Sequence, residues 1–329
     1  MVRLLLVSFV LVVAVPSLRA AAPPSAIRSS LDVRYHPGKE RQLLDVFGPA
    51  LSGKADPKRR YPVVMFVHGG SWIAGDKDHG GRIRAVGHSL ARQGFVAVLI
   101  NYRLSPRVKH PEHAKDVARA FAWVSKNIAD HGGDSDRIIL AGHSAGGHLV
   151  TLLITDECYL CDPTLALDAR ARKSIRAVVS LSGVYRVPEA EEFRAMTTVF
   201  IDNLVGEDGK GGFKGMMRPA LFAFSRGINP FRMVFGSDLD ICKKASPITH
   251  VRKGLPPMLL LNAENEVPGL RGMTADFAKA LRDLGNVVET KDIDDTTHRT
   301  ILHQLRARDS DASKVVHDFM TRHTLVGKP

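Results

Sequence analysis

The chain has 329 residues and a formal net charge of +12, from 46 lysines and arginines against 34 aspartates and glutamates. This length suits one large domain with a sizeable core. Hydrophobic residues make up 44% of the chain and charged residues 24%, which excludes a disordered or fibrous protein. No nucleic-acid-binding motif accompanies the positive charge, so we interpret it as a solvated basic surface and expect no nucleic-acid partner.

The first 22 residues have the layout of a secretory signal peptide. Arg3 precedes the apolar run Leu4–Val15, and Pro16 and small residues follow as far as Ala22. The run is too short for an ordinary membrane span, so we expect no stable membrane insertion. An uncleaved N-terminal anchor is the alternative. The pattern predicts a secreted or periplasmic protein whose mature part begins near residues 21–23.

Residues 23–329 alternate apolar strand patterns with helical patterns. An opening antiparallel pair is expected at Leu31–Tyr35 and Gln42–Phe47. Further strands are expected near Val63–Val67, Val96–Asn101, Ile138–Gly142, Val178–Ser182, Met258–Leu261 and Val287–Asp292. Helices are expected near Gly81–Gln93, Glu112–Asp130, Ser144–Ile154, Leu270–Leu284 and Ala312–His323. Strands that alternate with helices in this way predict an α/β domain, with a mostly parallel central sheet flanked by helices.

One stretch, Glu189–Phe231, breaks this alternation. It contains five glycines between Gly206 and Gly215, followed by the pair Met216-Met217. A long connection without strand periodicity is typical of a lid or a binding loop. Two interpretations stay open: a lid-like insertion whose apolar residues line a pocket, and a surface helical excursion.

The sequence Gly142-His143-Ser144-Ala145-Gly146 lies between an expected strand and an expected helix. A serine on such a tight turn is a nucleophile elbow, and the flanking glycines allow a backbone that a Cβ would obstruct. The Ala145 N–H, at the helix N-terminus, is aimed where an oxyanion would form. The motif alone also occurs by chance in a turn with a solvated serine.

A second motif, His68-Gly69-Gly70-Ser71-Trp72, follows the expected strand ending at Val67. Paired glycines after a strand let backbone N–H groups approach a ligand closely. We therefore assign the Gly70 and Ser71 N–H groups, with that of Ala145, as oxyanion donors, and Gly69 is a substitute for one of them. The plain alternative is a loop closed by glycines with Trp72 in the core.

A histidine and a carboxylate arrive late in the chain and in the required order. Glu264 and Glu266 follow the expected strand Met258–Leu261, and His298 lies just beyond the last expected strand. The chain has 14 histidines, and this position distinguishes His298 from the others. Asp294 and Asp295 also lie nearby, but they precede His298 so closely that the turn would be tight.

The three cysteines do not make a disulfide framework. Cys158 and Cys161 form a Cys-x-x-Cys pair that can bridge and leave Cys242 free. A zinc site would need two further ligands, and no matching pair is evident. We interpret the cysteine pair as structural or incidental and expect no metal.

The chain resembles the α/β-hydrolase esterases with a His-Gly-Gly-x-Trp oxyanion loop, from about Leu31 to about Val326. This set includes carboxylesterases and enzymes similar to feruloyl esterases, acetylxylan esterases, hormone-sensitive lipase and kynurenine formamidase. Besides the elbow and the oxyanion loop, the resemblance rests on Leu44-Asp45-Val46, Asn101-Tyr102-Arg103-Leu104-Ser105-Pro106, Ala245-Ser246-Pro247 and Thr297-His298-Arg299-Thr300-Ile301.

The resemblance implies the α/β-hydrolase fold and a catalytic triad of Ser144, Glu266 and His298, without any cofactor. The family's acid is commonly Asp, and the matching position here is Glu266. We expect an exported serine carboxylic-ester hydrolase acting on small-molecule or carbohydrate esters, such as acetyl or feruloyl decorations of polysaccharides. The alternatives are an arylformamidase, which export disfavours, and a non-catalytic binding protein, which the intact motifs disfavour.

Overall fold

The computed structural model describes residues 26–37, 41–50, 59–188 and 230–325. The expected signal peptide and nearly all of the expected insertion Glu189–Phe231 lie outside these residues. Within them, no helix combines the length and the apolar run that a membrane crossing requires.

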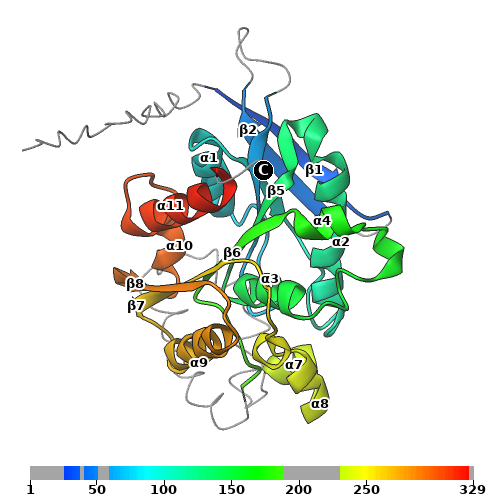
Figure 1. The fold of residues 1–329 in the computed structure, drawn as a ribbon, viewed down its shortest axis with the longest axis vertical. Helices are drawn as coiled ribbons and strands as arrows, with labels where there is room; N and C mark the ends of the chain where they lie inside the picture. The colour runs from blue at the N-terminus through cyan, green and yellow to red at the C-terminus, as the bar shows by residue number, and fades with distance from the viewer. Residues whose placement is uncertain (1–25, 38–40, 51–58, 189–229, 326–329) are drawn as a thin grey trace, which may run out of the picture.

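An eight-stranded sheet forms the centre of the domain, in the order β1-β2-β4-β3-β5-β6-β7-β8 (Figure 1). The strands are β1 (Ile27–Arg34), β2 (Leu43–Pro49), β3 (Tyr61–Val67), β4 (Val96–Ile100), β5 (Gly133–His143), β6 (Ile175–Leu181), β7 (Met258–Asn265) and β8 (Val288–Thr297). Strand β2 runs antiparallel to both β1 and β4, and the remaining neighbours are parallel. The predicted opening antiparallel pair and the mostly parallel sheet are confirmed.

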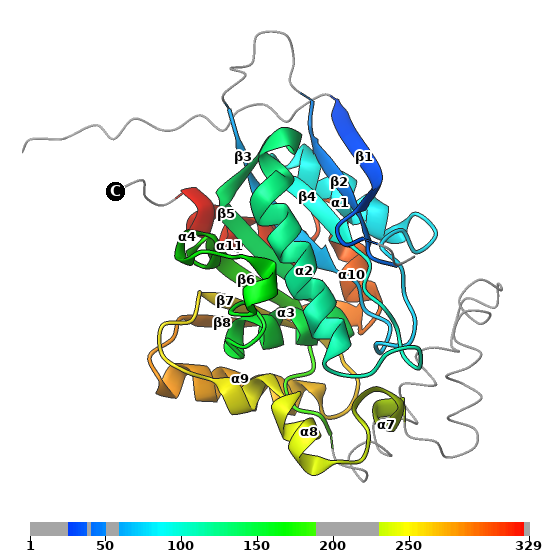
Figure 2. The same cartoon turned by 90° about the vertical axis from the view of Figure 1, so that its right-hand side faces the viewer.

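Helices cover both faces of the sheet (Figures 1 and 2). They are α1 (Arg82–Arg92), α2 (Glu112–Asn127), α3 (Ala145–Thr155), α4 (Ala169–Lys173), α7 (Pro230–Phe235), α8 (Leu239–Lys244), α9 (Leu270–Asp283), α10 (Thr300–Gln304) and α11 (Asp311–Leu325). Helices α1, α10 and α11 pack with one face of the sheet, and α2, α3 and α9 with the other. The four short helices α4, α7, α8 and α10 are absent from the sequence prediction, because five or six residues carry too little periodicity.

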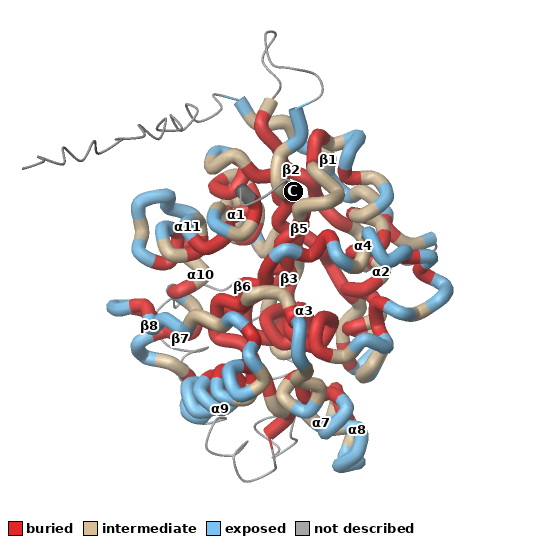
Figure 3. The backbone as a smooth tube through the Cα atoms, in the orientation of Figure 1, coloured by how far each residue is buried: buried red, intermediate tan, exposed pale blue. Residues whose placement is uncertain are grey.

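The buried residues form two clusters, one on each face of the sheet. Figure 3 shows the buried segments along the central strands. Strand β3 shows why. Val63, Met65 and Val67 face the side of α2 and α3, whereas Val64 and Phe66 face the side of α1 and α11. A parallel strand covered on both faces reads as a continuous apolar run, which is the pattern that located these strands in the sequence.

Strands β7 and β8 are longer than predicted. Their pairing continues past Ala263 and Ile293, shifts register, and resumes between Asn265 and Thr297. The extension carries polar and exposed residues, so an apolar pattern does not reveal it. Because the extended strands pair as far as Asn265 and Thr297, the residues that directly follow them, Glu266 and His298, lie side by side.

Candidate active site

Ser144 lies at the turn between β5 and α3, with φ 54° and ψ −118°. Such a backbone costs a non-glycine residue about 1–3 kcal/mol and is maintained by its surroundings. The Ser144 N–H donates to the Leu181 carbonyl over 2.8 Å, which ties the turn to β6. A Cβ on Gly146 would lie 2.0 Å from the Val67 carbonyl oxygen, so the close approach of helix α3 to β3 requires glycine there. The turn thus has the geometry of a nucleophile elbow.

The structure brings His298 and Glu266 to this serine. The His298 Nε2 and Ser144 Oγ atoms are 2.9 Å apart, and the His298 Nδ1 and Glu266 Oε1 atoms are 2.6 Å apart. All three side chains are nearly inaccessible to solvent. The carboxylate therefore fixes the imidazole with Nδ1–H toward itself, and the lone pair of Nε2 then faces the serine hydroxyl.

The Glu266 carboxylate is surrounded by hydrogen-bond donors. Besides His298, it accepts the Ala263 N–H over 3.2 Å and the Val267 N–H over 2.8 Å. Burial raises the pKa of Glu266, but the charge and hydrogen bond of His298, the Ser182 hydroxyl and the Val267 N–H outweigh it and lower the pKa to about 2. This carboxyl is therefore ionised at neutral pH.

The competing carboxylates lie elsewhere. Glu264 is exposed, and its Oε2 accepts the Asp295 N–H over 2.8 Å, so it bonds to the backbone of β8. Asp294 and Asp295 are exposed within β8. Of the four acids considered from the sequence, Glu266 is the one placed against His298.

The loop after β3 rests on the nucleophile turn. A Cβ on Gly69 would lie 3.2 Å from the Ser144 Cβ, and Gly70 adopts φ 119°, which L side chains rarely adopt. Gly69, Gly70 and Ser71 line one pocket with Ser144 and His298. Ala145 follows Ser144 as the first residue of α3, where an N–H has no preceding helical carbonyl to bond. Gly70 and Ser71 thus line the same pocket as Ser144, and Ala145 is the next residue along the chain; their roles as oxyanion donors stay a prediction.

A family model, BD-FAE, matches residues 44–211, just over half of the chain. The chain belongs to the BD-FAE family. It is 33% identical over 256 residues to Esterase LipQ of Mycobacterium tuberculosis, an alignment that covers 77% of this chain and 53% of LipQ. It spans about half the length of the first curated relatives it matches.

Solved structures show the same fold. Esterase B from Lactobacillus rhamnosis superimposes with a TM-score of 0.66 at 21% identity, covering 91% of this chain and 85% of that one. A truncated carbohydrate esterase from gut microbiota superimposes with a TM-score of 0.66 at 19% identity, covering 93% and 99%. The BD-FAE protein described here therefore has the α/β-hydrolase fold, as predicted.

Two buried histidines, His148 and His143, connect the segments of the BD-FAE site through hydrogen bonds. Neither of them is assigned a role from the sequence. The Trp72 Nε1–H donates to His148 Nδ1 over 3.2 Å, and His148 Nε2 donates to the Ala245 carbonyl over 2.7 Å. Burial lowers the pKa of His148 to about 3, so the ring is neutral and can accept at one nitrogen while donating at the other. This chain of bonds joins the oxyanion loop, the nucleophile helix and the Ala245-Ser246-Pro247 motif, to which the sequence assigned no role.

The side chain of His143, the residue before the serine, bonds to the backbone of His298. The His143 Nε2 atom donates to the His298 carbonyl over 2.7 Å, and the two rings lie 5.0 Å apart. Burial lowers the pKa of His143 to about 3, so a neutral ring lies beside His298. Its position inside Gly-x-Ser-x-Gly is the signal that could have identified it.

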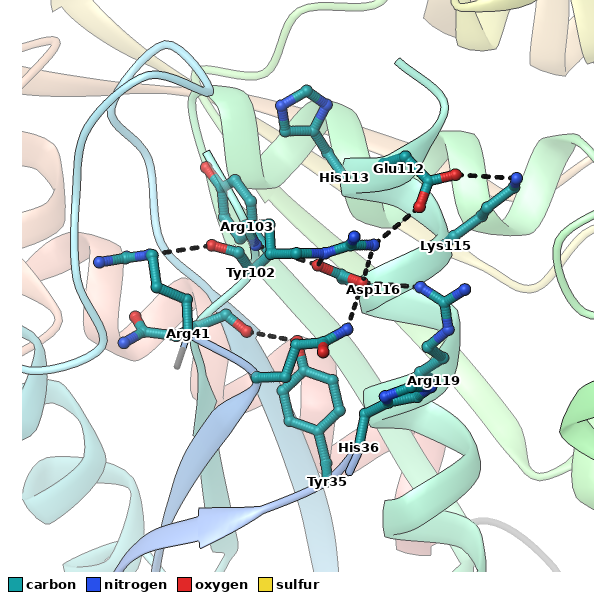
Figure 4. A network of polar contacts seen from close by, with 12 residues as sticks. Tyr35, His36, Arg41, Tyr102, Arg103, Glu112, His113, Lys115, Asp116 and Arg119 are labelled. Carbon is teal, nitrogen blue, oxygen red and sulfur yellow. Dashed lines mark hydrogen bonds and ion pairs between the residues drawn. The ribbon is translucent and has the colours of Figure 1, made fainter. Parts of the chain in front are cut away.

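A buried carboxylate supports the other side of the BD-FAE site (Figure 4). Asp116 of α2 is inaccessible to solvent and accepts hydrogen bonds from Arg103, Arg119 and Gln42. Arg103 contributes three of them, through its N–H, Nε and Nη2, at 2.7–3.0 Å. The neighbouring Tyr102 hydroxyl donates to the His68 carbonyl over 3.3 Å. The network thus anchors the segment that lies under the oxyanion loop.

The cysteines are free thiols, so the alternative of a Cys158–Cys161 bridge is not what the structure shows. Cys158 and Cys161 are exposed and Cys242 is half-buried. In the part of the chain that the structure describes, no group of three or more histidines, cysteines and acids is arranged to hold a metal ion.

Proposed function

We propose that this BD-FAE protein is a carboxylic-ester hydrolase that works through Ser144, His298 and Glu266. The observation that carries the proposal is the pair of contacts at His298, 2.9 Å to the Ser144 Oγ and 2.6 Å to the Glu266 Oε1. A nucleophile, a base and an orienting group at these distances form a hydrolytic triad. Similarity to LipQ, named as an esterase, supports the same activity.

The chemistry follows from these atoms. His298 Nε2 takes the Ser144 proton as the oxygen attacks the ester carbonyl. The N–H groups of Gly70, Ser71 and Ala145 stabilise the oxyanion, and Glu266 stabilises the imidazolium. His298 then gives its proton to the leaving alcohol, and an acyl-enzyme remains on Ser144. A water molecule, deprotonated by His298, releases the acid and restores the serine.

Turnover of p-nitrophenyl acetate tests this function. We expect Ser144→Ala to lower kcat by several powers of ten, because the acyl-enzyme route disappears. Ser29→Ala is the matched control, since Ser29 is exposed on β1 away from the pocket. A p-nitrophenyl phosphonate should label the Ser144 peptide of the wild type. If wild type and Ser144→Ala hydrolysed the ester equally, or if a different serine were labelled, the proposal would be wrong.

We further propose that the enzyme is exported and acts on acetyl or feruloyl esters of carbohydrates. Two observations support this: the signal-peptide pattern of residues 1–22 and the structural similarity to a protein described as a carbohydrate esterase. N-terminal sequencing of the native product should give a start near residues 21–23. The kcat/KM values for acetylated sugars, methyl ferulate and formylkynurenine should rank the formamide last. A chain that retains Met1 and prefers formylkynurenine would indicate an arylformamidase instead.

A further inference from the structure

The pocket beside Ser144 has an excess of basic side chains that the proposed triad does not use. Arg82, the first residue of α1, and Arg299, which directly follows His298, both line it. His79 lies on the same wall, and burial together with Arg82 and Arg299 lowers its pKa. Both arginine charges therefore act on one side chain of this wall, although they come from segments more than 200 residues apart.

Few acidic side chains offset these basic side chains. Among the described residues lining the pocket, Asp76 is the one carboxylate. It accepts the Asn101 Nδ2–H over 2.8 Å and the Asp78 N–H over 2.9 Å, and lies 3.5 Å from the Arg41 Nη1. The Asp76 carboxylate is thus already hydrogen-bonded to Asn101 and Asp78 and paired with Arg41. Among the described residues that line the pocket, the balance of charge is therefore positive.

Both arginines are half-buried, and Ile83 and Leu302 are apolar neighbours on the same wall. A partly desolvated guanidinium binds a carboxylate strongly, because its planar donors match the two oxygens. The net charge of +12 also favours the approach of anions to the protein. A neutral ester would use none of these features.

We propose that this pocket selects esters that carry a carboxylate near the scissile bond, and that Arg82 and Arg299 bind that carboxylate. This inference rests on the proposed esterase function and narrows its substrates, carbohydrate esters included, to those that carry a carboxylate. The anionic group can belong to the acid or to the alcohol half of the ester. Arg82 and Arg299 are therefore specificity-determining residues in the pocket that also contains Ser144.

Two matched substrate pairs test the inference. 4-Acetoxybenzoate and its methyl ester place the charge on the alcohol half, whereas monomethyl and dimethyl glutarate place it on the acid half. We expect the wild type to prefer the charged member of at least one pair in kcat/KM, which also identifies the half that is bound. Arg82→Gln and Arg299→Gln should each reduce the charged-to-neutral ratio by about tenfold to a hundredfold, since a charge-assisted hydrogen bond contributes about 1.5–3 kcal/mol. Arg82→Lys should retain part of the preference.

Arg92→Gln is the control, because it removes the same charge from the last turn of the same helix, where the side chain is exposed and does not line the pocket. Its charged-to-neutral ratio should equal that of the wild type. Ratios near one in the wild type, or a similar fall in Arg92→Gln, would overturn the inference while leaving esterase activity established. Wild type that hydrolyses no ester would instead contradict the proposed function. In that case calorimetry with 4-hydroxybenzoate, on Ser144→Ala with and without Arg82→Gln, still tests the arginine site: equal affinities would reject it.

Discussion

The two sides of Ser144 are built differently. On the oxyanion side, the loop His68–Trp72 is supported by buried groups from several elements, among them Tyr102, His148 and, behind them, Asp116. On the acid side, Glu266 and His298 follow the ends of two strands; His298 contacts the Ser144 hydroxyl, and Glu266 contacts His298. The groups on the oxyanion side hold the backbone of the loop in place. The groups on the acid side place an imidazole and an ionised carboxylate next to the proposed nucleophile. A substitution on the oxyanion side should therefore mainly reduce folding stability, whereas a substitution on the acid side should mainly reduce kcat.

The largest effect is expected on the acid side. Glu266→Gln should lower kcat by about two to four powers of ten, because His298 loses its orienting anion. Glu264→Gln is the matched control, since this exposed residue bonds to the Asp295 N–H and not to His298. Steady-state kinetics with p-nitrophenyl acetate, with circular dichroism to verify folding, measures both. If Glu264→Gln were the more damaging change, the acid assignment would be off by two residues.

On the oxyanion side, Asp116→Ala should mainly destabilise the fold. The change leaves the donors of Arg103, Arg119 and Gln42 without their buried acceptor, and breaking such a buried pair costs about 3–5 kcal/mol. Urea unfolding at pH 7 measures the loss. The control is Asp136→Ala, whose partner Arg170 is largely exposed and whose pair should contribute at most about 1 kcal/mol. Equal losses in the two variants would show that the buried network is not what stabilises this side.

These two sides also differ in how far the sequence predicts them. The motifs around Ser144, Gly70 and His298 are local, so short patterns locate them and the strand order gives their common edge. Asp116 stands in an amphipathic helix, and nothing near it in the chain shows that Arg103 and Gln42 will meet it. A network assembled from three separate segments becomes visible only once the fold brings them together.

Burial on both faces also decides how closely the ends of the strands are predicted. The continuous apolar runs of β3 and β4 gave their positions closely, because both faces are buried. The outer parts of β1 and β8 carry exposed and charged residues, so hydrophobic patterning ends before the hydrogen-bonded strand does. The placement of Glu266 beside His298 depends on that unpredicted extension of β7 and β8. From the sequence alone, Glu266 was preferred over Glu264 through family resemblance.

The buried histidines predict a dependence of stability on pH. Burial lowers the pKa of His113 to about 3, whereas an unfolded histidine titrates near 6.5. Between these values the unfolded chain binds one more proton, so the free energy of unfolding falls as pH decreases. His113→Gln should remove up to about 1.4 kcal/mol per pH unit from this slope, or about 2 kcal/mol at pH 5 relative to pH 8. Urea titrations of both proteins from pH 8 to pH 4 measure the difference, and parallel curves would contradict the prediction.

The smallest effect is expected from Trp72→Phe. The replacement keeps a ring that can pack on Phe231 and Phe235, whose centroids lie 5.6 Å and 5.0 Å from that of Trp72. It removes the Nε1–H that His148 Nδ1 accepts, and one such hydrogen bond contributes about 1 kcal/mol. We expect a loss of stability of that order, with a modest fall in kcat because the oxyanion loop is less firmly held. The other tryptophan provides the control: Trp123 is half-buried on α2 and does not line the pocket. Trp123→Phe should leave kcat unchanged, so a matching fall in both variants would mean that loss of an indole ring, and not the bond to His148, is responsible.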